Sequence, residues 1–295
     1  KSWYRERELN DDSEEFRDFL YLTQVHQAVA VKTETEFYRR AFNVFYSNGE
    51  GYTSGALYWQ LNSIWPTASW SSIEYGGRWK MLHYYARNFF RPFLISPWRT
   101  SGGSVRVTII NDFLMNFENL TLDIEILSYL QLEPLKKVSY DISKVHRKSC
   151  LSSYKKTFSF TTPAPSLQKT KKEHVFSLLK LRMELPSINQ KVYLFFTAPK
   201  FTYIQRAKVK IVNLSKTGKN QFSILLKTDA VALYVWLETD YEGVFSDNGF
   251  IMTKKTETIF FKSNSPLSVK NLRKNISVTS LSDTIDDKNI RKPLK

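Results

Sequence analysis

The sequence predicts a multidomain chain of the α+β class, in which a helix-strand-helix segment is followed by two immunoglobulin-like β-sandwich domains. Two observations predict this order. Before residue 97 apolar residues recur mainly at helical spacing, and after it short alternating runs are divided by Gly, Pro, Asn and Ser. Of the 295 residues, 42% are hydrophobic and 15% aromatic, a content sufficient for packed cores.

The first part of the chain has the order helix, strand, helix. From Phe16 to Arg40 apolar residues share one helix face, and residues 78–90 form a second amphipathic run. Between them, residues 55–61 are nearly all apolar, as in a strand that is covered on both faces. This order is that of the last part of a (β/α)8 TIM barrel, and we assign residues 17–98 to such a segment.

The rest of the chain has the pattern of β-sandwiches. A break at Ala198-Pro199-Lys200 divides it into predicted domains at 99–199 and 200–283. The polar ends, residues 1–16 and 284–295, are expected to be disordered. The expected strands are 105–110, 122–126, 157–160, 192–196, 207–211, 222–226, 231–236 and 258–261.

An aromatic loop follows the predicted strand at 55–61. Four of the seven tryptophans lie between Trp59 and Trp79, and the loop itself, residues 63–79, holds Trp65, Trp70, Tyr75 and Trp79, which is unusual for a surface loop. Loops at the carboxyl end of a barrel strand are where such folds keep their binding sites. We therefore expect the functional site in this loop.

The residues of this region resemble animal β-mannosidases, members of glycoside hydrolase family two. The resemblance is dense over residues 18–92 and thin over 103–230. It rests on the spacing of Trp65 from Ser69-Trp70 and on the motifs Tyr21–Gln24, Lys32–Arg40, Gly55–Asn62 (GALYWQLN), Glu74–Tyr84 (EYGGRWKMLHY), Arg87–Phe90 and Phe245–Phe250 (FSDNGF).

The resemblance implies a retaining enzyme that removes terminal β-D-mannose from glycoprotein oligosaccharides in the lysosome. Retaining glycosidases use two carboxyl groups, and the family carries both on barrel strands that precede the segment seen here. We therefore expect this chain to lack the catalytic carboxylates and to be inactive alone. Glu74 matches a separate loop element of the family, and we interpret it as a loop residue. Glu34 and Glu36 are interpreted as surface charges. Ser63 departs from the Asp usual in the family.

The resemblance also implies a sugar-binding role for Trp59, which it places against the sugar whose bond is cleaved. An indole face packs on the apolar C–H face of a pyranose, and its quadrupole favours the positive charge of the transition state. Asn62 is expected to orient the substrate from the same strand end, and Trp65 and Trp70 to line the mouth. The alternative is that these residues only pack the loop.

The excess positive charge is concentrated in one stretch. The chain has a formal net charge of +15, and residues 136–219 hold 19 Lys and Arg against 3 Asp and Glu, a net +16. Such a stretch with interleaved Tyr and Phe could bind nucleic acid. Because no nucleic-acid module signature is visible, we favour a solvated face of a β domain and expect no nucleic-acid partner.

Other signals bound the remaining possibilities. Sequons begin at Asn119, Asn213 and Asn275 and are compatible with the secretory pathway. The single cysteine, Cys150, excludes an internal disulfide framework. No cofactor is predicted, the histidines lack metal-ligand spacing, and no apolar run is long enough to cross a membrane. Two function classes remain: part of a β-mannosidase, or a non-catalytic carbohydrate-binding or structural β protein.

Overall fold

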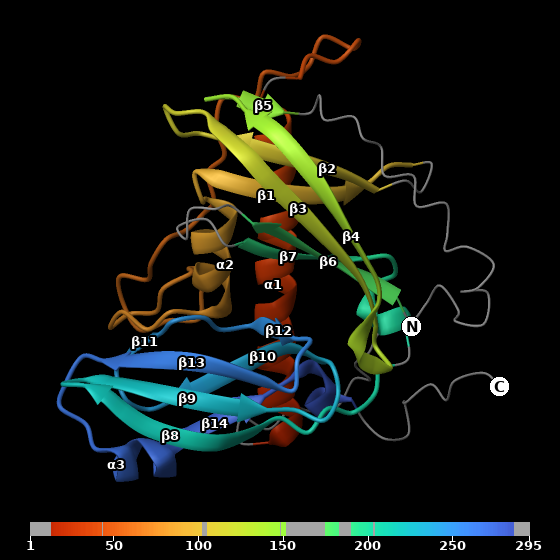
Figure 1. The fold of residues 1–295 in the computed structure, drawn as a ribbon. Coiled ribbons are helices and arrows are strands. Elements are labelled where there is room, and N and C mark those ends of the chain that lie inside the picture. Colours follow the sequence, from red (N-terminus) through yellow and green to blue (C-terminus); the bar gives the residue numbers. More distant parts are fainter. Residues whose placement is uncertain are drawn as a thin grey trace.

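A computed structural model describes residues 13–42, 44–101, 105–147, 149–151, 175–182, 190–202 and 204–285. One long helix, α1 (Glu14–Arg40), lies alongside two β-sandwiches, and a short helix, α2 (Met81–Phe89), lies beside it (Figure 1). The two sandwiches account for most of the described residues.

Helix α1 connects the two sandwiches along its length. Ser13 caps its first turn by accepting a hydrogen bond from the Phe16 N–H, so the helix begins at Glu14, inside the predicted lead-in of residues 1–16. Near its start, the Tyr21 hydroxyl donates to the Tyr234 carbonyl of the second sandwich at 2.7 Å. Near its end, Arg39 pairs with Asp112 of the first sandwich at 2.6 Å. The helix expected at 16–40 is thus confirmed.

Residues 55–61 do not form the predicted strand. Their backbone is extended, but only the end of the run is paired: the Leu61 carbonyl accepts from the Ile73 N–H at 2.9 Å, and Asn62 forms a parallel bridge with Ile73. A strand of a parallel sheet needs a hydrogen-bonded neighbour along its length, and among the described residues backbone pairing reaches only the last residues of this run. Leu57 is 96% exposed as a result. The barrel assignment of residues 17–98 therefore remains a prediction.

The first sandwich packs two antiparallel sheets. One has the order β1-β2-β5 and the other the order β4-β3-β6-β7. Phe93 and Ile95 of one sheet meet Leu122 and Ile124 of the other in the core. The strands are β1 (Phe93–Arg99), β2 (Val105–Asn111), β3 (Phe117–Ser128), β4 (Gln131–Val145), β5 (Ser149–Leu151), β6 (Val175–Arg182) and β7 (Gln190–Phe195).

Three of the four strands predicted here are found, and the one predicted at 157–160 lies outside the described residues. Strand β1 was not predicted, because Pro97 interrupts its apolar pattern. It begins ahead of the expected domain start at 99. Among the described strands β1 pairs only with β2, and an edge strand can contain proline.

The second sandwich is built in the same way, with sheets of order β11-β13-β9-β8 and β12-β10-β14. Phe222, Ile224, Leu226 and Leu237 are at most 1% exposed in its core. Its elements are β8 (Lys210–Gly218), β9 (Gln221–Lys227), β10 (Ala232–Thr239), β11 (Gly243–Phe245), β12 (Phe250–Met252), β13 (Thr256–Ser263), α3 (Val269–Asn275) and β14 (Ile276–Thr279), with 3-10 turns η3 (Pro199–Phe201) and η4 (Leu281–Thr284).

The strand predicted at 207–211 starts only at Lys210. The Ala207 N–H donates to the Ser282 hydroxyl at 3.1 Å and the Lys208 N–H donates to the Asp229 carboxylate at 2.7 Å, so side chains occupy the groups that a sheet ladder would use. Strands predicted at 222–226, 231–236 and 258–261 are found within β9, β10 and β13 or one residue from them.

A separate apolar cluster holds the parts together. Tyr21, Val25 and Ala28 of α1 pack there with Met81 of α2 and with residues of both sandwiches, among them Leu127, Tyr129, Val231 and Leu233. The start of α2 is therefore fixed from several sides, and with it the end of the aromatic loop.

Candidate functional site

The candidate site is the segment that precedes α2. Because residues 55–61 form no strand, they join the loop that follows them, and the aromatic loop of the structure comprises residues 55–79. Trp59 is 76% exposed, Trp65 61% and Trp70 65%, whereas Trp79 packs against the core of the second sandwich. The three predicted indoles therefore lie outside the packed cores, and burial gives no support to a purely structural role. Their contact with a sugar remains a prediction.

Asn62 lies at the end of the same extended run as Trp59. Its side chain is exposed, and its amide donates only a long hydrogen bond, 3.3 Å, to the carbonyl of Ser63. Gln60 donates to the Asn62 carbonyl at 3.0 Å, and the Trp59–Gln60 peptide bond is cis. An amide that is this weakly engaged can still hydrogen-bond a ligand.

Trp70 is held from the side of α1. The Gln27 side chain of that helix donates to the Trp70 carbonyl at 2.8 Å, which fixes the backbone while the indole stays exposed. The loop therefore presents its tryptophans from an anchored backbone, because the hydrogen bonds act on main-chain atoms.

A cluster of three serines and a lysine shapes the loop from inside. The Ser63 hydroxyl lies 2.9 Å from that of Ser69 and 2.7 Å from that of Ser71. Lys80 Nζ donates to the Ser69 carbonyl at 2.9 Å and to the Ser71 hydroxyl at 3.2 Å. Lys80 is only 9% exposed, and burial lowers the pKa of its ammonium, an effect partly offset by Glu74.

This cluster gives Ser63 a defined place. At the position where the resemblance predicts an aspartate, a serine hydroxyl joins two others around a buried ammonium. No ion pair of Lys80 is found within the described part of the chain. The cluster therefore holds a buried cation by hydroxyl and carbonyl oxygens.

A second hub ties the loop to α2. The Ser72 hydroxyl donates to the Leu61 carbonyl at 2.8 Å and contacts the Tyr58 hydroxyl at 2.9 Å and His83 Nδ1 at 3.1 Å. Burial, and then the charge of Arg87, lowers the pKa of His83. Ser72 is 0% exposed, so its hydroxyl is not accessible as a nucleophile. Its contacts instead orient Tyr58, the residue before Trp59.

The carboxylates of this region have structural surroundings. The Glu74 N–H donates to the Arg78 carbonyl in a tight turn of the loop, in accord with its interpretation as a loop residue. Glu34 accepts from the Tyr38 hydroxyl at 2.6 Å on the exposed side of α1. Glu36 is not a surface charge: it is 3% exposed, pairs with Lys32 at 3.0 Å and accepts from Ser96 at 2.9 Å. The β1 strand that buries it had escaped prediction.

The described residues contain no candidate metal site and no candidate membrane-spanning helix. They contain no group of three or more His, Cys, Asp or Glu side chains that could hold a metal, and no helix that is long and apolar enough to cross a membrane. The sequon residues Asn119, Asn213 and Asn275 are all exposed.

In the basic stretch, Lys144 pairs with Glu118 at 2.7 Å and Lys137 with Glu125 at 3.7 Å. The solvated-face interpretation stays a prediction.

Sequence reasoning missed the residues that support the loop. Lys80 was not singled out from the sequence, and its burial depends on three serines that are between nine and 17 positions away in the chain. The signal that could have found it was the run Ser69, Ser71, Ser72, which is rich in hydroxyl groups between large aromatics.

Comparison with known proteins identifies relatives over nearly the whole chain. A family model described as an Ig-fold domain of mannosidases matches residues 204–284. β-Mannosidases from goat (Capra hircus) and cattle (Bos taurus) are each 40% identical over 283 residues, which is 93% of this chain and 31% of theirs. The chain therefore spans about a third of the length of the curated relatives it matches.

Solved structures agree on the fold. The crystal structure of a β-D-mannosidase from Dictyoglomus thermophilum superimposes with a TM-score of 0.67 at 23% identity, covering 91% of this chain and 30% of that one. An exo-chitosanase from Amycolatopsis orientalis superimposes with a TM-score of 0.59 at 15% identity, covering 90% and 34%. The resemblance seen in the sequence is confirmed, and the chain is a relative of the animal β-mannosidases, similar to a portion of them that includes the Ig-fold domain.

Proposed function

We propose that the chain forms part of a retaining β-mannosidase, in which the aromatic loop lines the site for a terminal, non-reducing β-D-mannose of glycoprotein oligosaccharides. The observation that carries this proposal is the exposure of Trp59, Trp65 and Trp70 on a hydrogen-bonded loop. The support from relatives is the 40% identity to β-mannosidases that are about three times as long.

The chemistry assigns different roles to these residues. The exposed Trp59 indole can form a wall against the C–H face of the sugar ring and favour the positive charge that develops there. Asn62 can hydrogen-bond a hydroxyl from the same run, and Trp65 and Trp70 can line the mouth. The two carboxyl groups, about 5–5.5 Å apart in retaining enzymes, would come from the portion of the relatives that this chain does not match. The chain alone is then inactive.

The alternative is a non-catalytic carbohydrate-binding or structural protein. Two sandwiches make up most of the described residues, and an exposed aromatic surface could bind a glycan without cleaving it. The two proposals differ in whether the loop needs a neighbouring segment to bind. A β-mannosidase part should bind mannose poorly by itself, while a binding module should bind a β-mannoside and lose it with Trp59→Ala.

A chimeric enzyme tests the proposal directly. The matching region of goat β-mannosidase is replaced by this chain, and hydrolysis of p-nitrophenyl β-D-mannoside is measured next to the β-glucoside and β-galactoside. We expect activity restricted to the mannoside. A folded chimera without mannosidase activity, together with sugar binding by the isolated chain, would support the non-catalytic alternative instead.

A lysosomal location belongs to the same proposal. All three sequon asparagines are exposed, as acceptors of N-glycans must be. We expect the chain, expressed behind a secretory signal in animal cells, to lose apparent mass on treatment with peptide N-glycosidase. A chain that shows no shift, with Asn119→Gln, Asn213→Gln and Asn275→Gln variants running alike, would argue against passage through that pathway.

A further inference from the structure

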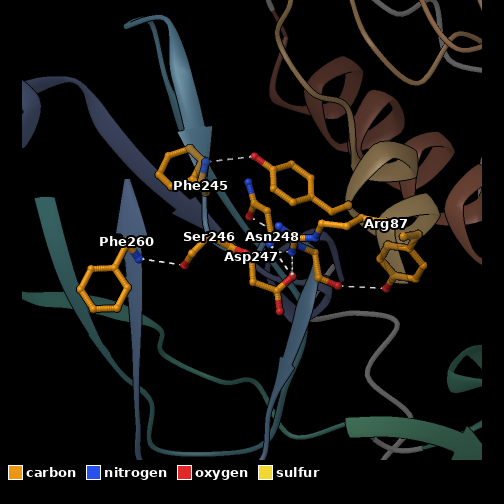
Figure 2. Close-up of polar contacts among 9 residues, drawn as sticks. Arg87, Phe245, Ser246, Asp247, Asn248 and Phe260 are labelled. Atoms are coloured by element: carbon orange, nitrogen blue, oxygen red, sulfur yellow. Dashed lines mark hydrogen bonds and ion pairs between the residues drawn. The ribbon is translucent and has the colours of Figure 1, made fainter. Parts of the chain in front are cut away.

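Residues 245–249 comprise the last residue of β11 and the loop that leads to β12. This segment, the 245–249 loop, packs against α2 (Figure 2). It carries the sequence Phe-Ser-Asp-Asn-Gly, part of a motif for which the proposed function has no role. Three side chains of α2 reach it. The Tyr84 hydroxyl accepts from the Phe245 N–H at 3.2 Å, the Tyr85 hydroxyl donates to the Gly249 carbonyl at 2.9 Å, and Arg87 Nη2 donates to the Ser246 carbonyl at 2.8 Å.

The same loop is fixed to the sandwich on its other side. The Asn248 side chain accepts from the Leu237 N–H at 2.7 Å and donates to the Leu237 carbonyl at 2.8 Å. The Ser246 hydroxyl accepts from the Phe260 N–H at 2.9 Å (Figure 2). Because these bonds join the loop to strands β10 and β13, it can act as a rigid extension of the second sandwich.

Arg87 connects this loop to the aromatic loop. Its guanidinium lies 3.5 Å from the Asp247 carboxylate and packs over the rings of Trp79 and Tyr84, 5.9 and 5.8 Å from their centroids. A planar guanidinium can donate to backbone and carboxylate oxygens through its forked N–H groups while its flat face stacks on a ring, a geometry that the compact lysine ammonium does not share. One side chain thus contacts the 245–249 loop and the last tryptophan of the candidate site.

Backbone pairing continues the connection into the site. Trp79 forms an antiparallel bridge with Ile73, and Ile73 forms a parallel bridge with Asn62. The Ser63 N–H also donates to the Ile73 carbonyl at 3.0 Å. A shift of Trp79 would therefore act on the backbone next to Asn62.

We propose that Arg87 is a positioning residue that links the 245–249 loop to Trp79, so that the second sandwich takes part in setting the conformation of the aromatic loop. The consequence for sugar binding rests on the proposed function, whereas the mechanical link does not. The Ig-fold domain then helps to position the residues of the candidate site, in addition to packing against α2.

Removing the Arg87–Asp247 ion pair is expected to change the position of Trp79 and to change the stability of the chain little. The Arg87 and Asp247 side chains are 36% and 44% exposed, and water screens such pairs. Burial raises the pKa of Asp247, an effect opposed by the charge of Arg87 and, more weakly, by the hydrogen bond from the Asn248 N–H and the charges of Arg91 and Lys191. At pH 7.5 His83, whose pKa is lowered, stays neutral and adds no charge beside Trp79.

Fluorine NMR of the complete 295-residue chain labelled with 5-fluorotryptophan tests the link. Trp79→Phe assigns the Trp79 resonance at pH 7.5, and Arg87→Gln, Asp247→Asn and their combination form a double-mutant cycle. We expect each single variant to move the Trp79 resonance, and Asp247→Asn to add no further shift once Arg87 is Gln. The matched control is Asp240→Asn, the same change at an exposed position of the same sandwich, which should leave that resonance in place.

Conservative variants separate positioning from general damage. Asp247→Glu should return the Trp79 resonance toward its wild-type position, while Arg87→Lys should not. Two results would overturn the proposal. One is that the shifts caused by Arg87→Gln and Asp247→Asn add up in the double variant; the other is that the Trp79 resonance does not move in an Arg87→Gln chain whose melting temperature is unchanged. Since no sugar is present, either result is independent of whether the loop binds mannose.

Discussion

The second sandwich and the aromatic loop are both rich in large aromatic residues, and they use them in opposite ways. Phe222 and Phe261 are 0% and 1% exposed in the sandwich core, whereas Trp59 and Trp65 are 76% and 61% exposed in the loop. A group of exposed indoles on one loop marks an interaction site more often than a packing defect. The difference teaches that aromatic content alone predicts neither burial nor function.

The two regions also satisfy their backbone groups differently. Sandwich strands pair in continuous antiparallel ladders, such as β9 with β13. The loop has only isolated bridges and takes its shape from side chains, above all the cluster of Lys80 with Ser63, Ser69 and Ser71. Its form therefore depends on a few polar groups.

The largest expected effect contrasts the two uses of an aromatic ring. Phe222→Ala should destabilise the chain by about 3–5 kcal/mol, because it empties a fully buried position, while Trp65→Ala should stay within about 0.5 kcal/mol. Urea unfolding followed by circular dichroism measures both. Comparable losses for the two variants would mean that the loop tryptophan is part of a core after all.

A smaller effect is expected where the sandwich meets α2. Gly249 has a φ of +68°, and a Cβ there would lie 2.8 Å from Met81 Cγ. Gly249→Ala should cost roughly 2–3 kcal/mol, from backbone conformation plus overlap. Gly49→Ala is the control, since Gly49 has a φ of +85° with open space around its Cβ; it should cost only about 1 kcal/mol in the same unfolding experiment. Equal costs would show that the α2 contact is loose.

The smallest effect on stability concerns the start of α1. Burial, and then Glu14, Asp283 and Glu15, raises the pKa of Asp18 from 3.8 to about 6. Ionised Asp18 therefore opposes folding, and the stability that its protonated form provides is present below pH 3.8 and lost as the pH rises through about 6.

Asp18→Asn should accordingly stabilise the chain by up to about 1 kcal/mol at pH 7.5 and by less at pH 4, after allowance for solvent screening. Melting temperatures at the two pH values provide the measurement, with Asp240→Asn as a control of equal charge change. A gain for Asp18→Asn that is independent of pH would contradict the assignment.

Much of the fold could be predicted because the spacing of apolar residues and the residues that break helices and strands are local features of the sequence. Helix α1 and strands β2, β9 and β13 followed from apolar spacing and from Gly, Pro and Asn breaks. The strand predicted at 55–61 was wrong for a non-local reason: its composition fits a doubly covered strand, but no described strand is hydrogen-bonded along it. Strand β1 was missed because Pro97 masked it.

The candidate site could be located by sequence, but not its supports. The density of tryptophan marked the loop, and the family resemblance singled out Trp59 and Asn62. The links from Lys80 to the serines, and from Arg87 to Ser246 and Asp247, join residues that the sequence keeps up to 160 positions apart. The Arg87 contacts depend on how the second sandwich docks on α2, which no local pattern encodes, whereas the Lys80 contacts are made within the aromatic loop and its junction with α2.

The central claim, that Trp59 forms a wall of the mannose site, is tested most directly by Trp59→Ala in the goat-enzyme chimera. We expect kcat/KM for p-nitrophenyl β-D-mannoside to fall at least about tenfold, a loss of about 1.4 kcal/mol of transition-state stabilisation. Because Trp59 is 76% exposed, the melting temperature should hardly change. Kinetics close to those of the parent chimera, or a loss explained entirely by unfolding, would contradict the claim.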